Sequence, residues 1–167
     1  MKSPIPKQFV APLIGGLLVV AALVGVLLFL SRGEHIELRG SIQKVRHLAP
    51  DESGTIAVID FRFVNPSNYP FVVRTIEVTL EDADGKLIEG MVAAEPDILR
   101  LFKYYPILGQ KFNETLHIRD KIASRQSLDR MLVARFPIPE NRFLARRNLR
   151  IRIEDVDGAV LEIAEHD

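Results

Sequence analysis

The chain contains no cysteine among its 167 residues. Disulfide bridges, zinc–thiolate sites and thiol catalysis are therefore excluded. A chain without cysteine is compatible with an oxidising compartment but gives no evidence for one. The sequence also has no excess of either charge, since it carries 22 basic and 22 acidic side chains. A nucleic-acid-binding domain needs a basic surface, so we expect no nucleic acid partner.

No charged side chain occurs over residues 8–31, QFVAPLIGGLLVVAALVGVLLFLS. Pro12 suits the first turn of a helix, where its missing N–H group costs nothing. A helix from there to residue 30 is about 28 Å long, close to the ~30 Å thickness of the bilayer's hydrocarbon core. A cleaved signal peptide has a shorter apolar stretch followed by a small-residue cleavage site. We therefore predict a short basic tail over 1–11, a transmembrane helix over 12–31 and one domain over 32–167.

The charged residues on either side of this helix predict its orientation in the membrane. Lys2 and Lys7 precede it, and a mixture of cations and anions follows it. Lysine and arginine are more frequent on the cytoplasmic side of membrane helices, and their count alone slightly favours a cytoplasmic C-terminal side. This rule weakens for long translocated domains. A short basic tail before a first helix is typical of a signal anchor. We expect a single-pass membrane protein with its domain outside the cytoplasm, in the periplasm or extracellular space.

Residues 32–167 repeatedly alternate apolar and polar side chains. In TIAVIDFRFV, residues 55–64, Ala57, Ile59, Phe61 and Phe63 share one face, while Asp60 and Arg62 lie on the other. The same alternation occurs in RTIEVTLE (74–81), MLVARF (131–136) and LRIRIE (149–154). Strands of this kind are apolar toward a core and charged toward solvent. Several of them separated by turn signals predict a mainly β domain, a β-sandwich.

One stretch, EPDILRLFKYYPIL over residues 95–108, has helical spacing instead of alternation. Pro96 can begin a helix and Pro106 can end it, so we predict a helix or compact insertion that closes one end of the sandwich. Phe102, Tyr104 and Tyr105, with Phe112 nearby, form an aromatic cluster. We favour a lid over the core for this cluster; the alternative is a binding rim or membrane-facing patch. A further helical turn is expected after Pro139.

Five arginines are concentrated in residues 142–152, and Arg146 and Arg147 are adjacent. A functional interpretation is contact with anionic lipid headgroups, to which each cation contributes about 1 kcal/mol. The alternative, which we favour, is a solvated outer strand face, because Arg150 and Arg152 alternate with apolar positions.

Two stretches share the pattern Glu-Asp-x-Asp-Gly, at residues 81–85 and 154–158. A calcium-binding EF-hand loop needs oxygen ligands at positions 1 and 12, where these stretches have apolar residues. Asp-Gly after an alternating strand predicts a hairpin turn, with glycine at the positive φ. We therefore expect two hairpins here and no metal ion or other cofactor.

The stretch HIRDKIAS, residues 117–124, contains His117, Asp120 and Ser124 and suggests a hydrolase. The chain has no Gly-x-Ser-x-Gly nucleophile elbow, and its four histidines lack metal-ligand spacing. We therefore assign no catalytic residue.

Residues 60–90, DFRFVNPSNYPFVVRTIEVTLEDADGKLIEG, place an Asn-Pro-Ser-Asn-Tyr turn between two strands. Asn65, Pro66, Asn68 and Tyr69 followed by the Ile-x-Val-x-Leu strand over 76–80 resemble the LEA14-like family, also called the water-stress and hypersensitive-response (WHy) domain. Ser67 stands where that family more often has asparagine. The resemblance implies an immunoglobulin or fibronectin-III-like β-sandwich, often membrane-anchored and without enzymatic activity.

Three functions follow as hypotheses. The first is a non-enzymatic, membrane-anchored domain for interaction or for envelope or stress protection, with the lipid bilayer and a protein of unknown identity as partners. The second is a domain that binds lipid or an apolar ligand at the membrane surface, through Phe102, Tyr104, Tyr105, Arg146 and Arg147. The third, a hydrolase, has the least support.

Overall fold

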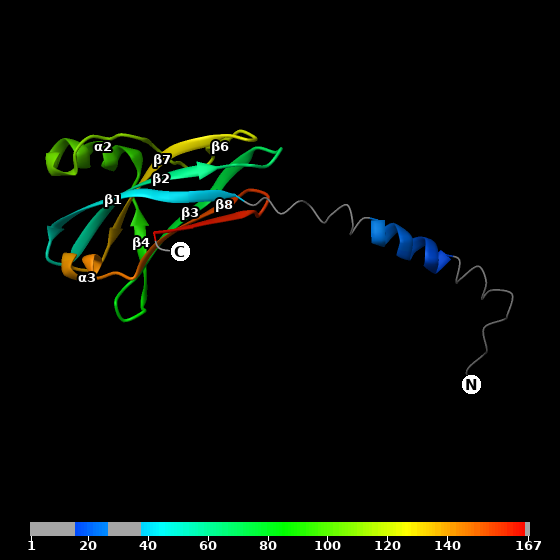
Figure 1. Ribbon diagram of the computed structural model, residues 1–167, viewed down its shortest axis with the longest axis horizontal. Coiled ribbons are helices and arrows are strands. Elements are labelled where there is room, and N and C mark those ends of the chain that lie inside the picture. Colours follow the sequence, from blue (N-terminus) through cyan, green and yellow to red (C-terminus); the bar gives the residue numbers. More distant parts are fainter. Residues whose placement is uncertain (1–15, 27–37, 166–167) are drawn as a thin grey trace. The chain divides into compact units, whose positions relative to one another are not determined.

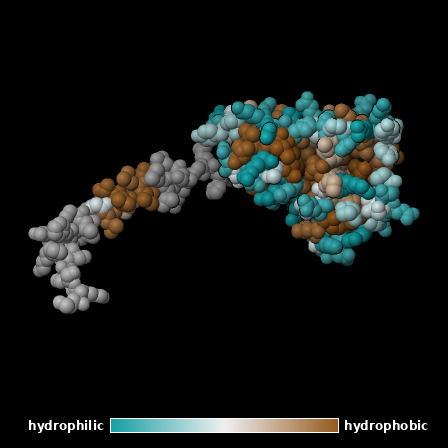
Figure 2. All heavy atoms as spheres, turned by 180° about the vertical axis from the view of Figure 1, so that it is seen from behind, coloured by the Kyte–Doolittle hydropathy of each residue, from teal (hydrophilic) through white to brown (hydrophobic). Residues whose placement is uncertain are grey.

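The structure is a computed structural model that describes residues 16–26 and 38–165. The chain divides into two compact units, residues 1–35 and 36–167. In the first unit, residues 16–26 form a helix with exposed, mostly apolar side chains, coloured brown in Figure 2. Within the described ranges, no helix is long and apolar enough to cross a membrane. The remaining parts of the predicted span over 12–31, and the predicted tail over 1–11, lie outside the described residues.

The described part of the second unit is mainly β, which confirms that part of the prediction (Figure 1). Its longer strands are β1 (Arg39–Asp51), β2 (Gly54–Val64), β3 (Phe71–Glu81), β4 (Leu87–Val92), β7 (Ser127–Phe136), β8 (Asn148–Asp155) and β9 (Val160–Ala164). The two-residue strands are β5 (Glu114–Thr115) and β6 (Lys121–Ile122). The helical elements are α2 (Glu95–Tyr104), the 3-10 turn η1 (Pro106–Leu108) and α3 (Glu140–Leu144).

The strands form one curled sheet in the order β1-β2-β7-β4-β3-β8-β9. These neighbours are antiparallel, whereas β5 pairs with β7 in parallel and β6 pairs with β3. The curl brings the two end strands together. A Cβ added to Gly40 of β1 would lie 2.7 Å from Cγ1 of Ile163 in β9. The interior of the curled sheet is therefore closed on the side where its edges meet.

The apolar faces of the strands fill this interior. Ala57, Ile59, Phe61 and Phe63 from β2 are fully buried there, as the alternation predicts. The predicted faces of the other strands join them, with Val78, Leu80, Leu132, Ala134, Phe136, Leu149, Ile151 and Ile153 in the same cluster. Because alternate side chains of a strand point to opposite faces, each charged neighbour points away from the interior.

A second apolar cluster lies on the outer side of β2 and β7. Val58 and Val133 are buried there under Ile98 from α2 and Leu108 from η1. The predicted helix is present as α2, but it covers the outer face of β2 and β7 instead of closing one end of a sandwich. Its first turn contains a proline and the acidic Glu95 and Asp97, which suit a helix N-terminus. The short helix expected after Pro139 is α3.

Both Glu-Asp-x-Asp-Gly stretches are hairpin turns, as predicted. They join β3 to β4 and β8 to β9, and Gly85 and Gly158 have φ angles of 82° and 88°. The Asp82 carboxylate accepts the N–H groups of Asp84 and Lys86 at 3.0 and 2.9 Å. These aspartates therefore stabilise the backbone of their turns.

Candidate functional site

The Asn65 loop, residues 65–70, connects β2 to β3 and is built around one buried amide. Asn65 is fully buried, and its side-chain NH₂ group donates to the carbonyl oxygens of Tyr69 and Ala123 at 2.9 and 3.1 Å. Its side-chain oxygen accepts both the N–H and the hydroxyl group of Ser67. A single asparagine thus fastens its own loop to the segment that precedes β7.

The same two segments are joined a second time at the surface. The guanidinium group of Arg125 donates two hydrogen bonds to Oδ1 of Asn68, at 2.8 and 3.1 Å, and its backbone has a φ of 56°. Tyr69 is exposed at the edge of the loop. The stretch that carries the family resemblance therefore supplies hydrogen bonds within the fold and leaves one aromatic side chain in solvent.

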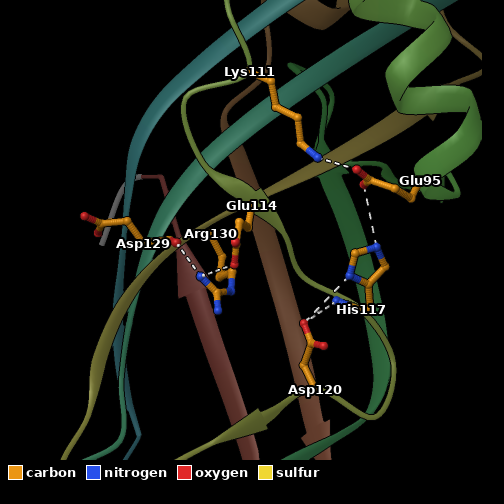
Figure 3. A network of polar contacts seen from close by, with 7 residues as sticks. All are labelled: Glu95, Lys111, Glu114, His117, Asp120, Asp129 and Arg130. Carbon is orange, nitrogen blue, oxygen red and sulfur yellow. Dashed lines mark hydrogen bonds and ion pairs between the residues drawn. The ribbon is translucent and has the colours of Figure 1, made fainter.

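A polar network surrounds His117, between the start of α2 and the loop before β6 (Figure 3). His117 Nε2 lies 3.6 Å from Glu95, and its Nδ1 lies 3.9 Å from Asp120. Asp120 accepts the backbone N–H of His117 at 2.8 Å, so its carboxylate closes the loop. Glu95 also pairs with Lys111. The network therefore joins α2 to the segment that follows η1.

The Glu95 carboxylate is held in its charged form. Partial burial favours the neutral carboxyl group, but Lys111, Thr115 and His117 together outweigh this effect and keep the pKa of Glu95 below its ordinary value. A negative Glu95 beside Lys111 suits a structural ion pair. A separate set of contacts lies on the left of Figure 3, where Arg130 bridges Glu114 and the carbonyl oxygen of Asp129 at 3.5 and 3.1 Å.

The structure brings together His117 and Asp120 but not the third member of the suggested hydrolase set. Within residues 38–165, Ser124 makes no hydrogen bond to either of them. His117 is about half exposed and lies between two carboxylates, and among the described residues its side chain makes no hydrogen bond to a hydroxyl group, as it would to a nucleophile. In the described ranges, no group of three or more histidine and carboxylate side chains could hold a metal ion.

A buried ion pair that the alternation pattern did not predict lies on the outer face of β1 and β2. Asp60, expected to face solvent, is 4% exposed because α2 and η1 cover that face. Arg46 donates to Asp60 at 2.8 Å and to the carbonyl oxygens of Leu108 and Gln110 at 2.5 and 2.9 Å. In the observed register Arg46 lies opposite Val58, but counting back from the Asp-Glu-Ser-Gly turn at 51–54 would place it opposite Ile59, because an irregularity between Leu48 and Asp51 shifts the pairing. The contact between Arg46 and Asp60 therefore could not be predicted from the turn.

The predicted aromatic cluster is divided by the fold. Phe102 is partly buried and packs against the outer apolar cluster, in agreement with a lid. Tyr104 and Phe112 are 71% and 62% exposed, and Tyr105 is at the boundary with 37%. The guanidinium group of Arg46 stacks over Phe102 and Phe112, 5.5 and 5.3 Å from the ring centroids. One cluster therefore contains both a lid and an exposed surface.

The predicted arginine cluster is largely engaged in ion pairs within the chain. Arg146 binds Glu165 through two hydrogen bonds of 2.6 and 2.7 Å and lies 4.6 Å from the ring centroid of Phe143. Arg147 is exposed, and only its backbone N–H bonds to Glu81. The other pairs are Arg142 with Asp82, Arg150 with Glu81, and Arg152 with Glu77 and Glu162. This geometry fits a solvated outer face, and within the described part of the chain Arg147 is the one of the two proposed lipid contacts that has no ion pair.

Two apolar grooves flank the connection between β4 and α2. The first, of about 510 Å³, is lined by side chains that include Met91, Ile98, Leu101 and Val133. The second, of about 410 Å³, is lined by apolar side chains and has His117 at its edge. Both are surface grooves of a size that accommodates a small molecule.

No protein-family model, no curated protein and no solved structure matches this chain.

Proposed function

We propose that this protein is a single-pass membrane protein whose residues 12–31 form a signal anchor. Its domain, residues 32–167, is an extracytoplasmic β-sandwich of the immunoglobulin or fibronectin-III-like kind, related to LEA14-like (WHy) domains. It acts without catalysis, in interaction with a partner or in protection of the envelope. The charge-free stretch over 8–31 and the Asn65 loop between two strands support this proposal.

The observation that carries the non-enzymatic part is the use of the polar groups around His117. Asp120 accepts a backbone N–H, and Glu95 is paired with Lys111. A general base needs a carboxylate or imidazole directed at a substrate proton. Here the carboxylates that orient His117 fasten loops to one another, so we infer a structural role for the network.

Alkaline carbonate extraction tests the anchor. We expect the full chain to stay in the membrane fraction, and a variant with Leu23→Arg and Val24→Arg to be extracted, because charges are costly in hydrocarbon. Val156→Arg is the matched control, since it adds a charge at an exposed turn and should leave the chain in the membrane. Extraction of the unaltered chain would contradict the proposal.

Chemical cross-linking of those membranes tests the interaction. A reproducible cross-linked product of defined mass is expected from the full chain. If the chain remains an uncross-linked monomer under all conditions, this result would count against an interaction role. Protection of the envelope would then remain as the proposed role.

A second candidate function is the binding of lipid or another apolar ligand in the groove beside α2. The specific observation is its apolar lining together with Met91, which is 77% exposed. Met91→Glu would place a carboxylate at the groove and should abolish co-purification of an apolar ligand detected by mass spectrometry. Leu87→Glu, at an exposed site outside the groove, is the control. Purified protein free of any apolar compound would remove this candidate.

A further inference from the structure

Large apolar side chains are exposed to solvent at the end of α2 and in the segment that follows it. We call residues 104–112 the apolar arm. Within it, Ile107 is 83% exposed, Tyr104 71% and Phe112 62%. Single exposed apolar side chains are common on protein surfaces, whereas several in one short segment mark an interaction site.

The arm is held in this conformation from beneath. Leu108 is buried in the outer apolar cluster, and Arg46 binds the carbonyl oxygens of Leu108 and Gln110. Asp60 accepts from Arg46 on one oxygen and from Asn113 on the other, at 2.8 and 2.9 Å. The buried ion pair therefore fastens the C-terminal end of η1 and the segment that follows it, on which the exposed side chains lie.

The charges around the arm leave an excess of cations. Lys111 pairs with Glu95, Arg100 with Asp97 and Arg130 with Glu114, so these charges cancel locally. Within the described residues, Lys103 and Lys44 have no ion-pair partner. The Lys44 ammonium lies 5.9 Å from the Phe112 ring, beside the exposed aromatic surface.

We propose that the apolar arm docks on the surface of an anionic lipid bilayer, with Tyr104, Ile107 and Phe112 in the headgroup region and Lys44 and Lys103 against lipid phosphates. Aromatic side chains with lysines at their border are typical of membrane interfaces. Each lysine adds about 1 kcal/mol of attraction to an anionic surface. The lid interpretation of the aromatic cluster then applies to Phe102 alone.

The docking rests on the proposed anchor, which would keep the domain beside a bilayer. Residues 32–38 reach at most about 24 Å when extended. Arg46 lies roughly 23 Å along β1 from Arg39 at the usual rise of a strand. The length of the chain therefore permits the arm to meet the bilayer that holds the anchor.

Tryptophan quenching in vesicles tests the proposal on the full chain. The sequence contains no tryptophan, so the residue introduced by Ile107→Trp is the single source of tryptophan fluorescence. Leu144→Trp is the matched control, because Leu144 is an exposed apolar residue of α3, outside the arm. Both variants are reconstituted into vesicles that contain phosphatidylserine and a spin-labelled phospholipid. Insertion to ~5–10 Å should shift the Ile107→Trp emission to the blue and reduce it roughly twofold, with little change for Leu144→Trp.

Flotation of the same vesicles separates the two possible failures. A chain that floats with the vesicles but shows no quenching at position 107 overturns the docking and leaves the anchor standing. A chain that does not float overturns both. If the emission shifts to the blue as protein concentration rises in the absence of vesicles, the arm binds a second copy of the chain. That result would overturn the lipid assignment. Equal quenching in vesicles without anionic lipid would overturn the role of Lys44 and Lys103.

Discussion

Asp60 and Arg62 are two residues apart on the outer face of β2, yet the fold treats them differently. Asp60 is buried under η1 with Arg46, whereas Arg62 pairs with Asp129 where both side chains are about half exposed. Both polar positions follow directly from the alternation of the strand. Their burial does not, because burial depends on which part of the outer face α2 and η1 cover.

Asp60→Ala should lower the free energy of unfolding by about 3–5 kcal/mol, because it leaves the Arg46 guanidinium buried without its carboxylate. Replacing both partners, with Arg46→Met and Asp60→Ala, should destabilise less than the sum of the single changes. Urea unfolding measures all three. Arg62→Ala on the same strand face is the control and should have only a small effect. A cost for Asp60→Ala as small as that of the control would show that the pair contributes no stability.

Asn65→Ala should destabilise the domain by about 2–3 kcal/mol, since it removes the buried amide that donates to the carbonyl oxygens of Tyr69 and Ala123. Asn68→Ala in the same loop removes only an exposed acceptor of Arg125 and should cost little. Equal unfolding midpoints in urea for the two variants would contradict the assigned role of the buried amide.

The stability contributed by Asp82 should disappear in acid. Burial acts to raise its pKa, but the N–H groups of Lys86 and Asp84 and the Arg142 guanidinium outweigh that and hold the pKa of Asp82 below its ordinary value. A lowered pKa in the folded state stabilises the fold above the unfolded pKa of about 4, and this contribution is lost as pH falls through the folded value. The stability difference between the unaltered chain and Asp82→Asn should therefore shrink below about pH 4. Urea unfolding at pH 7, 5 and 3 would contradict this if the difference stayed constant.

At the scale of elements, the strands and turns were predictable because their signals are local. The alternation over 55–64 assigns every inward residue of β2, and Asp-Gly identifies both hairpins. The helical spacing over 95–105 and its two prolines likewise predict α2. The face that α2 covers is set by packing between distant segments, which leaves no pattern in a single stretch. The sequence therefore contained no local signal that separates Phe102 in the lid from Tyr104 in solvent.

The closure of the curled sheet depends on a glycine where β1 meets β9. A Cβ at Gly40 would contact Ile163 and lie 2.9 Å from the carbonyl oxygen of Arg62. Gly40→Ala should therefore destabilise by about 2–3 kcal/mol through overpacking. Gly158→Ala, in an open turn at φ 88°, should cost about 1 kcal/mol from its backbone conformation alone. Thermal unfolding of both variants measures the difference, and the reverse order would argue against close packing of the two strands.

For the whole molecule, the sequence predicted a mainly β domain after an apolar segment, and the described residues agree on the β domain. Function could not be predicted in the same way, because sandwich-like folds host many activities and the deciding residues meet only in three dimensions. Arg46, Asp60 and the apolar arm come from three separate segments. Their arrangement in the fold identifies one candidate surface, which could not be defined from the sequence of the aromatic cluster alone.

We propose above all that a membrane anchor holds this domain outside the cytoplasm. The absence of native cysteine allows a direct test with single substitutions labelled by a membrane-impermeant maleimide in intact spheroplasts. Ala83→Cys, in the exposed turn between β3 and β4, should be labelled before lysis, and Ser3→Cys in the N-terminal tail only after lysis. Labelling of Ser3→Cys before lysis together with protection of Ala83→Cys until lysis would contradict the account.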